Sequence, residues 1–172
     1  MPSLLEPSDT CWRVETADDF SLIIDADAYF TAARAAMKKA KRSIVVGWDF
    51  DASIVLGHPD VHDEAPSRVG DFLLWLARQN PDLEIRLLLW NPGFLSAWSK
   101  ASNFYYLMRW KWHRQITVLL DGNHPIGSSH HQKILVIDDS VAFCGGIDVT
   151  LDRWDTRGHL DNDPMRRRPN GV

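Results

Sequence analysis

A short apolar run in the second half of the sequence, residues 134–137, most constrains the fold of this chain. It reads Ile-Leu-Val-Ile, is rich in β-branched residues, and predicts a strand buried on both faces of a sheet. His131 and Lys133 stand just before it, so on an extended chain both side chains point the same way. An imidazole beside an ammonium suits an anionic phosphorus centre, because lysine neutralises oxygen charge while histidine attacks or moves a proton.

Strands and helices alternate along the chain. Segments rich in β-branched residues predict strands, and apolar residues at helical spacing predict the helices between them. The expected strands are residues 11–15, 20–25, 43–48, 83–90, 115–120, 134–137 and 141–144. The expected helices are residues 27–41, 68–79 and 94–112, with Asp25 and Ser67 as N-caps of the first two. This order predicts an α/β protein with a mixed central β-sheet flanked by helices.

Length and composition are those of one globular domain. The chain has 172 residues, of which 45% are hydrophobic and 24% charged, so it can bury a substantial core. Residues 1–10 read as a loose leader, and residues 11–158 as the folded lobe. Residues 159–172 are polar and broken by prolines, which predicts a tail or the start of a linker to a second lobe.

Charge and hydropathy limit the classes of partner. The net charge is −4 with histidine neutral, which argues against a surface that tracks nucleic-acid phosphates. No apolar run approaches the ~18 residues of a membrane span. The first ten residues lack the basic and apolar pattern of a signal peptide. We therefore expect a cytoplasmic protein that can sit peripherally at a membrane.

Four other features each allow two interpretations. Asp49 and Asp51 could bind a metal, but their place after a predicted strand favours the rim of a cleft. The loop of residues 58–66 holds histidines and acids, yet its prolines and lack of cysteine favour a surface loop over a metal site. The cations of residues 38–42 could bind phosphate, but they are typical of a solvated helix C-terminus. The aromatic-rich helix of residues 94–112 fits a lipid-acyl platform and a core-plus-interface helix equally well.

The polar residues and glycines of residues 131–146 are similar to a known catalytic motif. His131-x-Lys133-x4-Asp138, followed by Gly145-Gly146, resembles the signature of the phospholipase D superfamily. Residues 146–150 (Gly-Ile-Asp-Val-Thr) and 153–156 (Arg-Trp-Asp-Thr) resemble its lipid-cleaving branch. Residues 47–51 (Gly-Trp-Asp-Phe-Asp) are similar to the early strand of bacterial members. The resemblance covers most of the chain, from Phe20 to Arg168.

The resemblance implies a phosphodiesterase that works by two displacement steps, with no metal or other cofactor. One histidine attacks phosphorus and forms a phosphohistidine, and a second histidine, from a second motif copy, protonates the leaving alcohol. His131 would be one of the two, and Lys133 would hold phosphate oxygens. A nucleophilic histidine needs an acceptor at its other ring nitrogen, for which Asp155 is the first candidate and Asp148 the second. Asp138, the last residue of the predicted catalytic set, would anchor the turn or pair with Lys133.

Substrate contacts are expected from residues around this catalytic set. Gly145 and Gly146 would permit close backbone approach at the floor of the site, and a packing role fits them equally well. The further candidates for substrate binding are His130, Asp148, Trp48 and Asp49.

The sequence contains one copy of the motif, whereas the resemblance implies two in each active site. We favour the hypothesis that this chain is the N-terminal half of a longer enzyme that hydrolyses or transfers the phosphatidyl group of phospholipids at a membrane surface. The isolated chain would then hold an incomplete site. One alternative is a homodimeric phosphodiesterase or nuclease with its site on a two-fold axis. The other is a non-catalytic module that binds anionic head groups.

Overall fold

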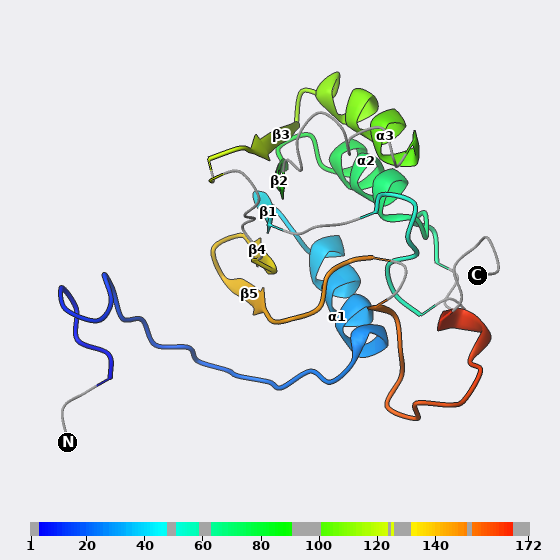
Figure 1. Cartoon of the computed structure of the whole chain (residues 1–172). Coiled ribbons are helices and arrows are strands. Elements are labelled where there is room, and N and C mark those ends of the chain that lie inside the picture. Colours follow the sequence, from blue (N-terminus) through cyan, green and yellow to red (C-terminus); the bar gives the residue numbers. More distant parts are fainter. Residues whose placement is uncertain are drawn as a thin grey trace.

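The computed structural model describes residues 4–47, 51–58, 63–90, 101–123, 125, 132–150 and 153–166. Figure 1 shows a folded body of helices and strands, preceded by a long segment that runs away from it. The helices are α1 (Ala26–Lys38), α2 (Val69–Gln79), α3 (Ala101–Lys111) and the short 3-10 helix η3 (Pro164–Arg166). The strands are β1 (Ser43–Gly47), β2 (Glu84–Trp90), β3 (Ile116–Asp121), β4 (Ile134–Ile137) and β5 (Val141–Cys144).

The five strands form one mixed sheet in the order β3-β2-β1-β4-β5. β1 pairs in parallel with β2, and β2 in parallel with β3. β4 pairs antiparallel with β1 and β5, with Gly47 opposite Ile134. The predicted α/β class with a mixed sheet is therefore confirmed. Because β4 is antiparallel to β1, the start of β4 lies at the same end of the sheet as the carboxyl ends of β1, β2 and β3.

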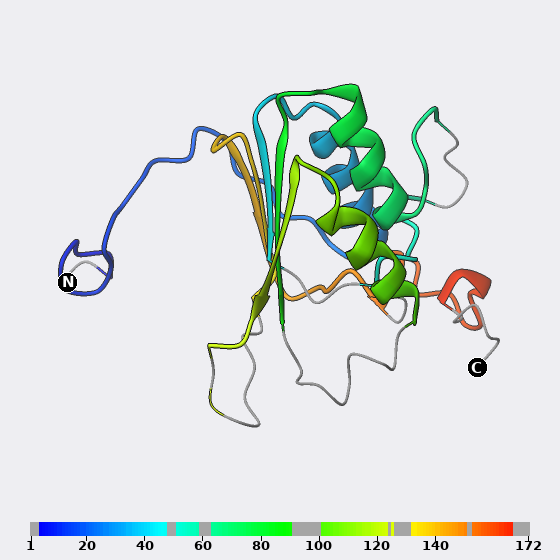
Figure 2. The same cartoon turned by 90° about the horizontal axis from the view of Figure 1, so that it is seen from above.

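The three α-helices pack on one face of the sheet, as Figure 2 shows. Alternate residues of the strands point toward these helices and are buried, as the period of two requires. They meet buried side chains on each helix, such as Phe30 on α1, Phe72 on α2 and Trp110 on α3. The buried strand residues include Ile44, Val46, Ile85, Leu87, Leu135 and Ile137.

The opposite face of the sheet is more exposed in the described part of the chain. On β4, Leu135 and Ile137 are buried, whereas Ile134 and Val136 are half-buried. The prediction that this strand is buried on both faces is therefore wrong for the described chain. An apolar run reports what a strand can bury, but it does not show which of its faces a neighbouring element covers.

The segment before α1 contains no strand between residues 12 and 24, so the predicted strands at 11–15 and 20–25 are wrong. Cys11 forms only an isolated bridge with Pro7. Trp12 and Phe20 are 87% and 88% exposed. The segment is apolar enough to be a strand, but without a neighbouring strand to complete the hydrogen-bond ladder it stays extended.

The helix ends differ slightly from the prediction. α1 ends at Lys38, three residues early, and Asp25 stands at its N-cap position without making a side-chain cap hydrogen bond. α2 has Arg68 rather than Ser67 at its N-cap position. The predicted start of the third helix, residue 94, lies outside the described residues. Among the helices that the structure describes, none is both long and apolar enough to cross a membrane.

Candidate active site

Lys133 stands immediately before β4 and carries a buried ammonium group. Alternation along the strand turns its side chain to the same face as Leu135, toward the helices. Its Nζ lies 3.0 Å from Asp148 Oδ1, and the two side chains are only 4% and 6% exposed. Nζ makes no hydrogen bond with any described residue. Burying a lysine is costly unless its charge is compensated, so Asp148 stabilises the ammonium, whose N–H donors are not used by any described hydrogen bond.

This ion pair lies at the end of the sheet where ligands of open α/β proteins usually bind. In such sheets, ligands bind beyond the carboxyl ends of the parallel strands, and β1 to β3 end beside the start of β4. His130, His131, Trp48 and Asp49 were predicted to reach this end. All four lie outside the described residues, so their positions in the site stay predictions.

Asp148 follows β5 and is held close to the loop after β1. Its neighbour Val149 is fully buried, and the Val149 carbonyl accepts a hydrogen bond from the Asp51 backbone N–H at 3.1 Å. The Asp51 carboxylate accepts from the Ser53 backbone N–H and hydroxyl, at 2.9 and 2.7 Å. Asp51, which the sequence placed at the cleft rim, therefore shapes the turn that braces the Asp148 segment. Among the described residues, no group of three or more histidines, cysteines or acids could hold a metal ion.

Gly145 and Gly146 follow β5 directly, next to Lys133. The Gly145 N–H donates to the Lys133 carbonyl oxygen at 3.3 Å. A Cβ added to either glycine would meet no described atom within 4 Å. The packing role is therefore not supported by the described neighbours, and the open space beside the glycines leaves room for a ligand. A hollow of about 330 Å³ lies here, between β5, Tyr29 and the segment around Phe20.

Asp138 lies at the other end of β4, away from Lys133. Its carboxylate accepts hydrogen bonds from the backbone N–H groups of Lys41, Arg42 and Ser43, at 2.8, 2.7 and 2.8 Å. Burial alone would raise its pKa, but these donors outweigh burial and lower the pKa. The alternative that Asp138 pairs with Lys133 is wrong, since Asp148 is the partner. Its contacts are those of a turn anchor, and they give no support to a catalytic role.

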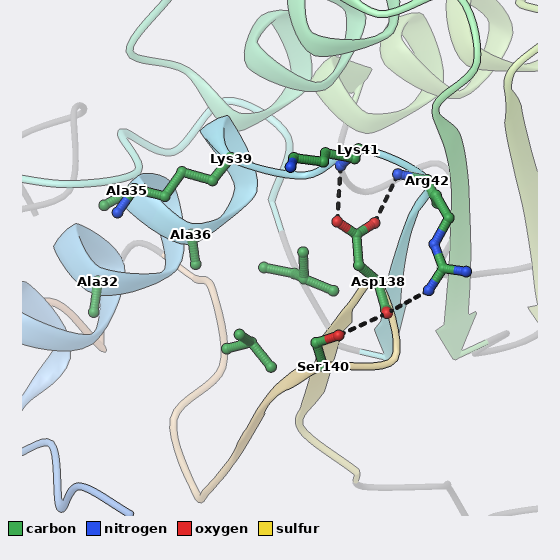
Figure 3. A pocket seen from close by; sticks show the side chains of 10 residues that line it. Ala32, Ala35, Ala36, Lys39, Lys41, Arg42, Asp138 and Ser140 are labelled. Carbon is green, nitrogen blue, oxygen red and sulfur yellow. Dashed lines mark hydrogen bonds between the residues drawn. The ribbon is translucent and has the colours of Figure 1, made fainter. Parts of the chain in front are cut away.

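A larger hollow, of about 620 Å³, also lies at the Asp138 end of the sheet. Figure 3 shows alanines of α1 on one side of it and Lys39, Lys41 and Arg42 above it. The cavity is thus bordered by three of the cations of residues 38–42, for which a phosphate patch was the less favoured interpretation. This hollow lies at the end of the sheet opposite to Lys133, away from the predicted catalytic residues.

Asp155 forms a cluster that sequence reasoning did not find. Its carboxylate accepts from the Thr156 N–H at 2.8 Å, and lies 2.9 Å from His159 Nδ1 and 3.3 Å from Arg166 Nε. The hydrogen bond with His159 is the largest cause of a lowered Asp155 pKa, and it raises the pKa of His159. His159 Nε2 also lies 3.7 Å from an oxygen of Asp25. His131, the predicted partner of the Asp155 carboxylate, lies outside the described residues. The described contacts of Asp155 and His159 connect this segment to Asp25 at the start of α1, and we call the Asp155–His159 pair the latch.

Comparisons with known proteins bear on the family. No protein-family model matches the chain. The chain is 33% identical to phospholipase D1 of Mus musculus in an alignment of 162 residues that covers 87% of this chain and 14% of that protein. It is 30% identical to phospholipase D A of Dictyostelium discoideum over 143 residues, 80% of this chain and 11% of that protein. It is 31% identical to phospholipase D zeta 1 of Arabidopsis thaliana over 147 residues, 81% of this chain and 13% of that protein.

These relatives support the phospholipase D superfamily. The chain spans 11% to 14% of their length, so the likeness concerns one part of each relative. All three are eukaryotic proteins, and the likeness of residues 47–51 to bacterial members stays a prediction. The family that the motif around His131 and Lys133 predicted is thus supported by similarity over at least four-fifths of the chain.

Proposed function

We propose that the chain is one catalytic lobe of a phospholipase D-type phosphodiesterase, which hydrolyses or transfers the phosphatidyl group of phospholipids. The buried ammonium of Lys133, paired with Asp148 at the carboxyl end of the sheet, carries this proposal. An ammonium with unused N–H donors stabilises the charge that develops on phosphate oxygens, and a dry surrounding strengthens that interaction. The similarity to named phospholipases D supports a phospholipid as the substrate.

In the proposed reaction, the imidazole nitrogen of His131 attacks phosphorus while the bond from phosphorus to the head-group oxygen breaks. The leaving oxygen takes a proton from a second histidine, supplied by a second lobe. That histidine then removes a proton from water or another alcohol, whose oxygen displaces His131 and restores the free enzyme. Lys133 contacts the non-bridging oxygens in both steps, and Asp148 holds the Lys133 ammonium in place. His131 and the second histidine could exchange roles, and the chemistry would balance in the same way.

Turnover of a soluble short-chain phosphatidylcholine by the full-length protein tests the proposal. We expect His131→Asn and Lys133→Ala each to lower turnover by several orders of magnitude, because the members of such a set depend on one another. The matched control is Lys39→Ala, which removes an exposed lysine at the opposite end of the sheet and should leave turnover unchanged. Turnover that survives in the His131→Asn protein contradicts the proposed mechanism.

A change in Lys133 can also act through stability, because it leaves Asp148 buried without its cation. The Lys133→Ala protein should therefore be compared with a Lys133→Met, Asp148→Leu double variant, which removes both charges. If the double variant is as stable as the wild type and still inactive, the loss reflects chemistry rather than unfolding. An active double variant would show that the ammonium is not needed.

A further inference from the structure

The outer side of α3 exposes four large apolar residues. Phe104, Tyr105, Met108 and Trp112 are 63%, 58%, 42% and 84% exposed. The helix does not need them for its own packing, because Tyr106 and Trp110 already fill its inner side at 5% and 1% exposure. We call the four exposed residues the α3 stripe.

The spacing of the α3 stripe places its members on one side of the helix. Residues three to four apart in a helix lie one above the other, so Phe104, Met108 and Trp112 form a row, with Tyr105 beside it. The Trp112 N–H still donates to the Met108 carbonyl, so the last residue of the row keeps the helical position. The row is about 12 Å long at the rise of an α-helix. It is a contiguous apolar surface rather than a set of scattered exposed side chains.

The charged residues of the α3 segment itself are all basic. From Ala101 to Gln115 the sequence contains no aspartate or glutamate, and it contains Arg109, Lys111 and Arg114. Arg109 pairs with Asp71 of α2 at 2.7 Å. Lys111 and Arg114 are exposed, and no carboxylate of the described residues pairs with either. This helix is therefore basic and aromatic on the surface of a chain whose net charge is −4.

We propose that the α3 stripe docks onto an anionic phospholipid surface, an inference that rests on the proposed phospholipid substrate. Helices with aromatic and apolar residues on one side and lysine or arginine beside them lie in the plane of the membrane interface. Tryptophan and tyrosine are enriched at that interface, because their rings are apolar with one polar group. A second copy of the chain fits less well, since two facing stripes would bring two basic segments together with no acidic residue in residues 101–115 to pair with them.

Docking through the α3 stripe would also bring the candidate active site close to the membrane surface. α3 begins at the end of the sheet that holds Lys133, because it follows β2 and runs back antiparallel to it, as Figure 2 shows. Phe104, at the start of the stripe, is therefore on the side of the molecule where the substrate would enter. A helix bound along the interface keeps this end of the sheet at the membrane surface, where the phospholipids are.

Co-sedimentation with vesicles tests this proposal on the full chain, with no need for turnover. The probe is large vesicles of equimolar phosphatidylcholine and phosphatidylglycerol, compared with vesicles of phosphatidylcholine alone. We expect the wild type to bind the anionic vesicles more strongly and to lose that preference at high salt. A Phe104→Ser, Trp112→Ser double variant should bind at least tenfold more weakly, and a Lys111→Glu, Arg114→Glu double variant should lose the preference for anionic lipid.

Trp12→Ser is the matched control, because Trp12 is also highly exposed, at 87%, but lies outside α3. It should bind vesicles as the wild type does. Equal binding by the stripe variant and the wild type, or an equal loss in Trp12→Ser, overturns the proposal. So does a fall in molar mass of the stripe variant in solution, which would show that the stripe joins copies of the chain. If the chain binds vesicles through the stripe but the full-length protein hydrolyses no phospholipid, the proposed function fails and this inference stands.

Discussion

Asp63 shows how much one residue in a loop can contribute to the fold. Its carboxylate pairs with Arg34 at 2.6 Å and with Lys38 at 3.0 Å, both on α1. The Arg34 side chain is 8% exposed, and its guanidinium lies 4.5 Å from the centre of the Phe72 ring on α2. The sequence placed Asp63 in a polar surface loop, but it neutralises a buried cation that packs between two helices.

Because of this ion pair, the titration of Asp63 makes the stability of the fold depend on pH. The hydrogen bond from Arg34 is the largest cause of a pKa that lies well below the ordinary range of an aspartate. A carboxyl whose pKa is lower in the folded than in the unfolded chain stabilises the fold at pH values above the unfolded pKa, about 4. That stabilisation is lost as the pH falls from about 4 toward the folded pKa, because the unfolded carboxyl then binds a proton that the folded carboxylate does not, and this proton uptake favours unfolding.

We expect Asp63→Asn to lower the free energy of unfolding at pH 7 by about 2 kcal/mol, since it leaves the buried Arg34 without a full counter-charge and weakens its hydrogen bond. The variant should also lose less stability than the wild type when the pH is lowered below about 4. Urea unfolding at both pH values measures the two effects. Asp18→Asn, an exposed acid in the segment before α1, is the control and should change neither. Parallel pH profiles for the wild type and Asp63→Asn would contradict the assignment.

At the scale of the elements, Gly70 lies at a close contact between α2 and α3. The Trp110 indole N–H donates to the Gly70 carbonyl at 3.2 Å, and the Tyr106 hydroxyl donates to Asp71 at 2.7 Å. A Cβ on Gly70 would overlap the Tyr106 ring. Real Cβ atoms do not come so close to other atoms, so glycine is needed here for the contact between the helices.

Gly70→Ala should therefore destabilise the protein, although alanine normally favours a helix by up to about 1 kcal/mol over glycine. Forcing the Tyr106 ring from its place costs about 1–3 kcal/mol, and it strains the hydrogen bond to Asp71. The net loss can be measured by thermal or urea unfolding. Gly145→Ala is the control, because its added Cβ meets no described atom within 4 Å and the stability should stay the same. A Gly70→Ala protein that is more stable than the wild type would contradict this prediction, because it would show that the Tyr106 ring can move away at little cost.

The order of strands and helices was predictable because it depends on local patterns. The α/β class, the central strands and the first two helices follow from apolar spacing and turn residues. The segment of residues 20–25 has the same apolar character, but a strand also needs a neighbouring strand to pair with. The spacing of apolar residues does not show whether this segment pairs with β5, the edge strand of the sheet. The prediction that β4 is buried on both faces failed for a similar reason. The burial of Ile134 and Val136 depends on which element covers the second face of the sheet.

The candidate site was predictable only where residues stand near one another in the sequence. Lys133 and the glycines after β5 follow from the motif. The partner of Lys133 had to be chosen among several acids, and the structure selects Asp148 over Asp138 because β4 separates Asp138 from the start of the strand. The pairing of Asp155 with His159 has a helical spacing of four, which could have drawn attention to it. Its contact with Asp25 depends on the tertiary fold and gives no local signal.

In the whole molecule, the two ends of the sheet have different roles. At one end, Asp138 closes the turn after β4 by binding three backbone N–H groups, and its contacts involve only the chain itself. At the other end, Lys133 and Asp148 form a buried ion pair beside open space at Gly145. The latch of Asp155 and His159 ties the chain to the start of α1, which lies at this same end because α1 runs antiparallel to β1. Of the predicted catalytic set, the described residues other than Asp138 are therefore grouped at the Lys133 end.

The number of motifs sets the expected state of the chain in solution. It carries one His-x-Lys motif, and the proposed reaction needs two histidines at one phosphorus atom. If the second histidine belongs to another lobe, light scattering behind a sizing column should give the molar mass of a single chain, 19.6 kDa. The isolated chain should then turn over no measurable short-chain phosphatidylcholine, because the leaving alcohol lacks its proton donor.

We expect the single-chain mass, because the exposed apolar residues of the α3 stripe lie beside Lys111 and Arg114, and residues 101–115 contain no acid to neutralise these cations when two copies face each other. A stable species of twice that mass that is also active would instead support two copies of His131 meeting across a two-fold axis. In that case a mixture of His131→Asn chains with wild-type chains should lose activity more steeply than the wild-type fraction falls, because each mixed pair loses one of its two histidines. A strictly proportional fall would mean that each chain works alone, and would contradict both arrangements.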